Sequence, residues 1–160
     1  MATYDGNAGT FDLVIQAEYK IPVVLEIEGT AELYVAPPDW FFALGKPPHD
    51  KRVKARLFDI FETDAYFVIS DSGLMLGSWT GYSASYSFGP LSASLDVYLA
   101  TQAAIQWSPF QVAGGIELHG DVHLSAFGIG VSLTADALLE GCAPHPFLSL
   151  IHISEPTRPY

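Results

Sequence analysis

The residues whose spacing best fits a metal-binding or proton-transferring site lie in one short segment, Glu117-x-His119-x-Asp121-x-His123. Carboxylates and imidazoles are the side chains that bind zinc and serve metal-assisted hydrolysis. On a straight strand, all four would project from one face at intervals of about 6.6 Å. A single row cannot surround one ion tetrahedrally, so at most two of them could share it. We expect a solvated polar face, with His119, Asp121 and His123 as the alternative metal ligands.

Gly120 leaves two local structures open for this segment. A strand that continues through Gly120 keeps the four side chains on one face. A tight turn at His119-Gly120 would instead place Leu118 opposite Asp121 and break up the row.

A cysteine and a histidine also stand close together, in Gly-Cys-Ala-Pro-His-Pro. Cys142 and His145 could form a thiolate pair, but a proline-broken loop favours a thiol without a chemical role. Two pairs of carboxylates are also present, Glu26 with Glu28 and Glu62 with Asp64. Carboxylates that cleave glycosides must face each other across a cleft, which spacing alone does not indicate.

Sequence motifs of the common catalytic sites are missing. The chain has no Gly-x-Ser-x-Gly elbow, no Gly-x-x-x-x-Gly-Lys phosphate loop and no His-Glu-x-x-His. We therefore predict a protein that is not an enzyme, with no catalytic residue and no cofactor.

The elements that would position these residues are strands, because apolar residues recur at every second position. The first predicted strand is Phe11 to Tyr19. It is followed by Val23 to Glu28, Ala31 to Val35, Trp40 to Leu44, Val53 to Phe61, Ala65 to Ser70 and Leu74 to Trp79. From Leu91 onward the alternation runs in three longer stretches, 91–107, 112–124 and 131–139. A helix cannot keep alternate residues on one side for so long. We predict an all-β fold, either an extended antiparallel meander or a sandwich-like sheet, as a fragment of a larger β structure.

Charge is distributed unevenly along the chain. Seven Lys and Arg stand against 18 Asp and Glu, a net charge of −11, which lacks the basic surface that nucleic-acid binding requires. One cysteine excludes an internal disulfide framework. Five basic residues lie between Lys46 and Arg56, and none follows from Leu57 to Phe147. We interpret this basic segment as a solvated loop leading into an edge strand, and the alternative is a docking patch for an acidic partner or membrane surface.

A weak internal similarity is present. Phe88-Gly89 and Phe127-Gly128 are each followed by a Ser-rich alternating stretch, at an offset of about 39 residues, which is a spacing suited to a repeated group of strands. We predict one all-β segment over 1–147, with 1–80 and 81–147 as the alternative halves.

Four segments resemble parts of very large bacterial β-rich proteins of uncharacterised function. They are the aromatic strand Asp39 to Pro47, the Leu-Phe-x-x-x-x-x-x-x-Tyr strand within Arg56 to Val68, and the pieces Phe88 to Leu91 and Leu124 to Gly128. The resemblance covers about residues 30 to 140 and implies a repeat-like segment of a long β scaffold. It implies no activity and carries over no site residue.

The C-terminal residues Leu148 to Tyr160 contain Leu-Ser-Leu-Ile-His-Ile-Ser-Glu-Pro-Thr-Arg. This stretch resembles the translation of a transposase end and adapter used in sequencing libraries, so we expect it to be a non-native tail on a longer natural chain. The alternative is a short amphipathic C-terminal strand.

These observations favour a non-enzymatic structural or interaction segment of a larger bacterial β-rich protein. Its partners would be the remainder of its own chain or similar β segments, with self-association through an uncovered apolar face. A fragment of a membrane-associated or lipid-handling β-structure is the first alternative, because long alternating strands also suit that setting. A metal-assisted hydrolase using His119, Asp121 and His123 is the second.

Overall fold

The computed structural model describes residues 1–143, and within them the chain is almost entirely β. The strands are β1 (Ala2–Asp5), β2 (Thr10–Ile21), β3 (Leu25–Ala36), β4 (Asp39–Leu44), β5 (Val53–Leu57), β6 (Phe61–Ser70), β7 (Gly73–Phe88), β8 (Leu91–Trp107), β9 (Phe110–Ala126) and β10 (Ile129–Ala143). One short 3-10 turn, η1 (His49–Lys51), precedes β5. The all-β antiparallel fold expected from the alternation is confirmed, in its meander form.

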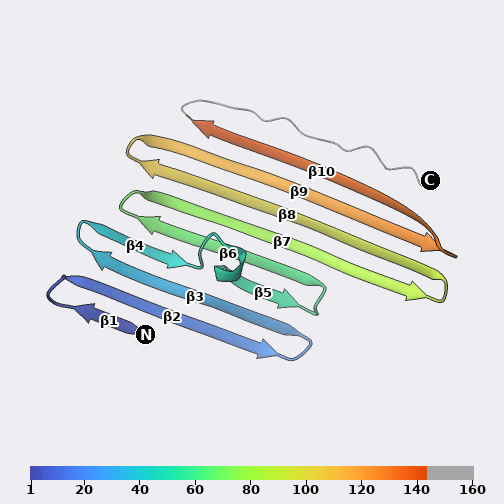
Figure 1. The fold of residues 1–160 in the computed structure, drawn as a ribbon, viewed down its shortest axis with the longest axis horizontal. Helices are drawn as coiled ribbons and strands as arrows, with labels where there is room; N and C mark the ends of the chain where they lie inside the picture. Colours follow the sequence, from blue (N-terminus) through green and yellow to red (C-terminus); the bar gives the residue numbers. More distant parts are fainter. Residues whose placement is uncertain (144–160) are drawn as a thin grey trace.

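All ten strands belong to one antiparallel sheet, with the order β1-β2-β3-β4-β6-β7-β8-β9-β10. Figure 1 shows β1 at one edge and β10 at the other, with the four longest strands, β7 to β10, on the β10 side. The short β5 pairs with the start of β3 and the start of β6, beyond the end of β4. Every strand except β5 therefore pairs with the one before it in the sequence, as in a meander.

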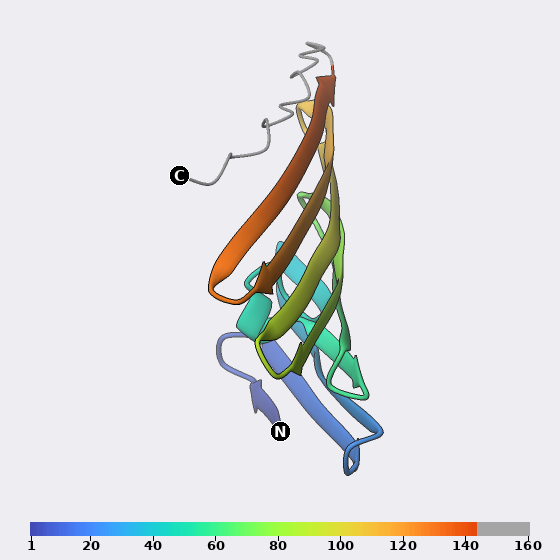
Figure 2. The same ribbon diagram turned by 90° about the vertical axis from the view of Figure 1, so that its right-hand side faces the viewer.

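The sheet is a single twisted layer, as Figure 2 shows, and η1 lies on one side of it. No second layer covers either face within residues 1–143, so very few side chains are buried. Among the described side chains, only the apolar Ala43 and the charged Asp64 are buried. The strands are held by their ladders of backbone hydrogen bonds and by cross-strand side-chain pairs rather than by an enclosed core.

Two predicted strand boundaries are wrong. Gly29-Thr30 does not separate two strands, because β3 runs through it and a Cβ at Gly29 would lie 3.0 Å from the Val53 side chain. The glycine therefore allows β5 to approach closely. The predicted strand Val53 to Phe61 is instead two strands, β5 and β6, joined by a tight turn in which Phe58 and Asp59 both have φ of 53°.

The longer stretches are continuous strands. β9 passes through Gly120 without a turn, so Glu117, His119, Asp121 and His123 do share one face. Phe88 is the last residue of β7, before the turn at Gly89-Pro90, and Phe127-Gly128 form the turn between β9 and β10. Both turns lie at the same end of the sheet, and Phe127 N donates to Pro90 O at 3.0 Å. His145 and the predicted tail from Leu148 to Tyr160 lie outside the described residues.

Candidate interaction surface

The two faces of the sheet differ completely in charge. The register places on one face the odd-numbered residues of β2, β3, β5, β6, β8 and β10 and the even-numbered residues of β1, β4, β7 and β9. We call this the apolar face, since none of these positions holds Asp, Glu, Lys, Arg or His. Every Asp, Glu, Lys, Arg and His within the ten strands lies on the opposite face, which we call the polar face. One face of this sheet is therefore suited to water and the other is not.

Polar atoms on the apolar face largely satisfy one another. Apart from four tyrosines, its only hydroxyl side chains among the described strands are Thr63, Ser78, Thr80 and Thr101. The Oγ1 atoms of Thr63 and Thr80 are 2.9 Å apart, and Ser78 Oγ lies 2.8 Å from Thr101 Oγ1. Thr63 Oγ1 is also 3.1 Å from the carbonyl of Trp79. Such pairing lowers the cost of removing these hydroxyls from water.

An apolar hollow of about 780 Å³ lies on this face where β7 to β10 turn. Tyr86, Phe88, Leu124, Phe127 and Ile129 are among the residues that line it. Phe88 and Phe127 are 70 % and 80 % exposed, although both are large aromatic side chains. Exposed aromatic residues in or next to hairpin turns are unusual, since turns on a water-facing surface are normally polar.

The polar face carries the row of side chains that the sequence singled out, and each has its own partner on the neighbouring strand. His119 Nδ1 is 2.5 Å from Asp136 Oδ1, and His123 Nδ1 is 2.8 Å from Ser132 Oγ. Thr134 Oγ1 donates to Asp121 Oδ2 at 2.7 Å. The three candidate ligands therefore point to three different partners on β10 rather than to one point.

A metal centre needs at least three donors close together. Within residues 1–143 no group of three His, Cys, Asp or Glu side chains is arranged to hold an ion. The same row is better described as a cross-strand ladder of polar pairs, which stabilises the pairing of β9 with β10.

The ladder continues toward the centre of the sheet as a row of rings. Tyr98 stacks on His119 with ring centroids 4.9 Å apart, and Trp79 lies 5.9 Å from Tyr98. The Tyr98 hydroxyl donates to Glu117 Oε1 at 2.6 Å. This hydrogen bond, with partial burial and the nearby negative charge, raises the pKa of Tyr98 to about 12.

The most buried charged side chain is Asp64, and its pairing with Arg52 and His49 was not predicted from the sequence. Asp64 on β6 is only 3 % exposed and accepts hydrogen bonds from Arg52 Nη1 at 2.7 Å. His49 Nδ1 lies 2.8 Å from its other oxygen. Arg52 Nε donates to the Pro47 carbonyl at 2.8 Å, and its guanidinium lies 5.2 Å from the Tyr66 ring centroid. The cluster fixes the 45–52 loop over the polar face.

The basic segment is largely neutralised by its neighbours. Besides Arg52, Lys46 pairs with Glu32 at 2.6 Å and Lys54 with Glu28 at 3.5 Å. Arg56 lies between Glu26 at 3.9 Å and Glu62 at 3.1 Å. The expected solvated loop leads into β5, but β5 is not an edge strand because it pairs with both β3 and β6. Glu26, Glu28 and Glu62 thus bind basic side chains of adjacent strands, and Asp64 binds those of η1 and the loop that follows it.

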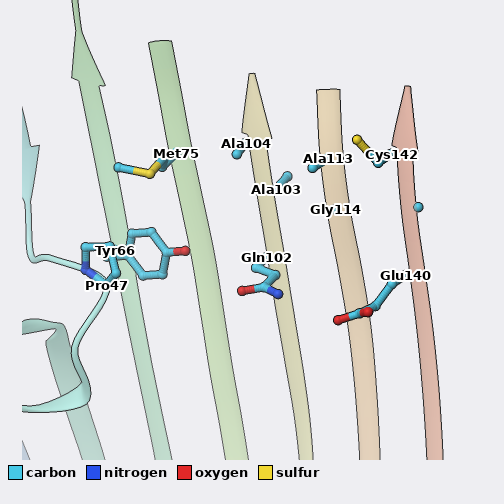
Figure 3. A pocket seen from close by; sticks show the side chains of 11 residues that line it. Pro47, Tyr66, Met75, Gln102, Ala103, Ala104, Ala113, Gly114, Glu140 and Cys142 are labelled. Carbon is cyan, nitrogen blue, oxygen red and sulfur yellow. The ribbon is translucent and has the colours of Figure 1, made fainter. Parts of the chain in front are cut away.

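A second hollow, of about 480 Å³, lies on the polar face between the 45–52 loop and β10 (Figure 3). Small residues of β8 and β9 form its floor, with Tyr66 and Met75 at one side and Glu140 and Cys142 at the other (Figure 3). Cys142 is exposed, and its only hydrogen-bond contact within residues 1–143 is a weak one with the carbonyl of Ala143 at 4.0 Å. Among the described residues, no titratable side chain forms a hydrogen bond with the Cys142 thiol.

Comparison of the chain with protein-family models, with curated proteins and with solved structures finds no match. Among the described residues, no helix is long and apolar enough to cross a membrane.

Proposed function

We propose that this chain is a non-enzymatic structural and interaction segment, one layer of a larger β assembly, whose apolar face packs against a second apolar surface. The observation that carries the proposal is the absence of charged side chains from one face across all ten strands. A monomeric soluble sheet tolerates scattered charges on an exposed face at no cost. A face free of charge supports contact with something other than water.

The area of the apolar face is sufficient for stable packing. The four longest strands, β7 to β10, contain 15 to 17 residues each. With strands about 4.8 Å apart and a rise of about 3.3 Å per residue, their face covers roughly 1,000 Å². Stable protein interfaces bury about 800 Å² per partner, and exposed apolar patches on monomers rarely exceed a few hundred Å². The natural partner would be the remainder of a longer chain or a similar β segment.

Membrane-associated or lipid-handling function is the second candidate, because the hairpin turns themselves are apolar. Phe88, Phe110 and Phe127 are 70 %, 66 % and 80 % exposed at or beside the turns of β7 to β10, and Trp107 is 44 % exposed. The hydrocarbon of a lipid layer would cover both the apolar face and these turns, whereas a second sheet would cover mainly the face and leave the turns exposed. Metal-assisted hydrolysis is not proposed, because His119, Asp121 and His123 each bind a separate partner.

A matched pair of variants on β8 tests the proposal. Leu95 lies on the apolar face and is 37 % exposed, while the adjacent Ser94 lies on the polar face. Self-association by analytical ultracentrifugation and binding of a hydrophobic dye should fall in Leu95→Glu and stay unchanged in Ser94→Glu. Flotation with neutral phosphatidylcholine vesicles, lost only in Leu95→Glu, would favour lipid handling instead. A sharply melting monomer that binds neither dye nor vesicles would refute both proposals.

A further inference from the structure

Phe-Gly recurs where β7 meets β8 and where β9 meets β10, and both places lie at the end of a part of the sheet that projects beyond its neighbours. β6 pairs with β7 no further than Tyr82, so the last six residues of β7 and the adjoining ends of β8, β9 and β10 extend past it (Figure 1). At about 3.3 Å per residue, the two turns lie about 20 Å beyond the start of β6. We call residues 85–94 and 123–132 the tip.

The tip holds no Asp, Glu, Lys or Arg on either face. Its apolar face presents large side chains to solvent, since Tyr86, Phe88 and Ile129 are 69 %, 70 % and 72 % exposed. Phe127, in the turn itself, is 80 % exposed. These four side chains are among those that line the hollow of about 780 Å³. Apolar groups therefore cover both one face and the turns of the tip, which marks it as a contact surface.

The polar face of the tip is built from small hydroxyl side chains. It holds six serines together with Gly130 and His123. The hydroxyls of Ser92 and Ser125 lie 2.7 Å apart, and His123 Nδ1 is 2.8 Å from Ser132 Oγ. Hydroxyls that already have partners cost less to remove from bulk water than charged groups do. This face can therefore enter a zone of mixed polarity together with the apolar one.

We propose that the tip inserts edge-on into the interfacial zone of a phospholipid bilayer without net charge. The inference rests on the membrane-associated candidate function, and it assigns the contact to the tip rather than to the whole apolar face. Interfacial elements enter by about 5–10 Å, which corresponds to the last two or three residues of each strand. Phe88, Phe127 and Ile129 would reach the acyl chains. The Tyr86 ring would lie at the level of the headgroups, where amphipathic aromatic rings are favoured.

The distribution of charge favours an uncharged bilayer over other partners. Strands β6 to β10 hold no Lys or Arg that could attract anionic lipid. Asp96 and Asp121 lie directly opposite each other at the base of the tip, and the chain has a net charge of −11. These charges repel an anionic surface and disfavour a second copy of this chain. A protein partner would also cover mainly one face, whereas a lipid interface surrounds both faces and both turns.

Open backbone edges limit the depth of insertion. Within residues 1–143, Ala84 to Phe88 of β7 have no partner strand on the side away from β8. Unpaired N–H and C=O groups are costly in the hydrocarbon core, which holds no water to satisfy them. The tip therefore suits the interfacial zone, which retains water, rather than the centre of the bilayer.

The opposite end of the sheet has exposed aromatic side chains too, but it is charged. Phe110 is 66 % exposed beside the turn between β8 and β9. Asp5, Asp39 and Asp71 lie in or next to the other turns at that end. Because carboxylates disfavour entry into lipid, Phe110 provides a matched control for the phenylalanines of the tip.

Flotation of the full chain with phosphatidylcholine vesicles tests the proposal, in about 0.01 M salt where charges act over about 30 Å. The unmodified chain should float, and adding phosphatidylglycerol to the vesicles should weaken its binding. Phe88→Asn and Phe127→Asn should each lower the partition coefficient at least about tenfold, because each removes a large side chain from the acyl region. Asn tolerates the positive φ of 52° at Phe127. Phe110→Asn should leave binding unchanged.

The outcomes separate the tip from the rest of the sheet. No flotation of the unmodified chain, stronger binding to the anionic vesicles, or an equal loss in Phe110→Asn overturns the proposal. Leu99→Glu changes the apolar face eight residues after Leu91, about 26 Å from the turns, and should leave flotation unchanged. A loss there equal to that in Phe127→Asn would show that lipid covers the whole face, and it would overturn insertion by the tip alone.

Self-association, measured by ultracentrifugation, reports separately on the packing of the apolar face. Phe127→Asn should leave self-association unchanged, so tip insertion and face packing can fail independently of each other. A loss of self-association in Phe127→Asn with unchanged flotation would assign the tip to a second copy and overturn the proposal.

A fluorescent probe of polarity gives a second readout that leaves the phenylalanines in place. In a Cys142→Ser background, which removes the only native cysteine, Ser87→Cys and Gln111→Cys place a label at opposite ends of the polar face. Both native side chains are exposed. With nitrobenzoxadiazole as the label, phosphatidylcholine vesicles should shift the emission to the blue at Ser87→Cys only. No shift there, or equal shifts at both positions, would also overturn the proposal.

Discussion

The buried carboxylate of Asp64 allows a quantitative test of what holds the polar face together. Asp64 is 3 % exposed and Arg52 15 % exposed, so their ion pair is largely removed from water. Replacing Arg52 with Met keeps much of the side-chain volume but leaves the carboxylate with His49 as its one remaining partner within residues 1–143. His49 itself is 65 % exposed. Removing one member of a buried pair costs about 3–5 kcal/mol.

We expect Arg52→Met to cost about 3 kcal/mol, at the lower end of that range because His49 remains near the carboxylate. The matched control is Arg56→Met. Arg56 and its partner Glu62 are 47 % and 36 % exposed, and surface pairs of this kind contribute about 0–1 kcal/mol. The difference between the two variants, about 2–3 kcal/mol, follows mainly from burial, since both lose an arginine that binds a carboxylate. Arg52→Met also removes the hydrogen bond to the Pro47 carbonyl, which adds to the difference.

Urea unfolding at neutral pH, followed by tryptophan fluorescence, measures these differences. The Trp79 ring lies 6.3 Å from that of His49 and should report on the cluster. With a slope of about 1–3 kcal/mol per molar urea, Arg52→Met should lower the midpoint by about 1–3 M. Adding Asp64→Asn to Arg52→Met should recover part of the loss, because the unpaired charge is gone. Equal effects of Arg52→Met and Arg56→Met, or no recovery in the double variant, would refute the argument from burial.

Three further predictions follow from single contacts. The fold favours the neutral form of Tyr98, so the contribution of Tyr98 to stability should be complete below pH 10 and disappear as the pH rises toward about 12. Ultraviolet titration of the phenol should show this late ionisation in the wild type but not in Glu117→Gln. Gly45→Ala should destabilise the fold by about 2 kcal/mol or more, since φ is +64° and a Cβ would lie 2.8 Å from Val53 N. Gly89→Ala, where φ is +57° and the space is open, should destabilise it by about 1 kcal/mol. Thermal melting measures both losses. Thr101→Val should cost about 1 kcal/mol by leaving the Ser78 hydroxyl without its partner. Adding Ser78→Ala to Thr101→Val should restore stability if the apolar face is covered, and should not restore it if that face is fully hydrated.

Local sequence was sufficient for the class of fold and for the assignment of faces. Alternation over Leu91 to Trp107 and over Phe11 to Tyr19 reflects the two-residue repeat of a strand, and no other regular structure satisfies it. Strand boundaries were mispredicted at two places where glycine and turn did not coincide. The turn after β5 uses Phe58 and Asp59 at positive φ, while Gly29 lies inside a strand, so the usual association of glycine with turns fails at both places.

The partners of the candidate residues could not be found from sequence, because they depend on the register between strands. Spacing alone placed His119, Asp121 and His123 in one row, and that row is present. Only the alignment of β10 on β9 gives each a separate partner in Asp136, Thr134 and Ser132, which makes the row a polar ladder. The burial of Asp64 likewise depends on a loop that returns over β6 from residues 45–52.

The sequence by itself determined that this protein is a sheet with two unlike faces, because side-chain direction in a strand alternates whatever its neighbours are. The tertiary structure decided that all ten strands align those faces on the same side. It also decided which carboxylate is buried and which ring lies on which. These properties depend on contacts between strands distant in the chain, and local alternation carries no information about such contacts.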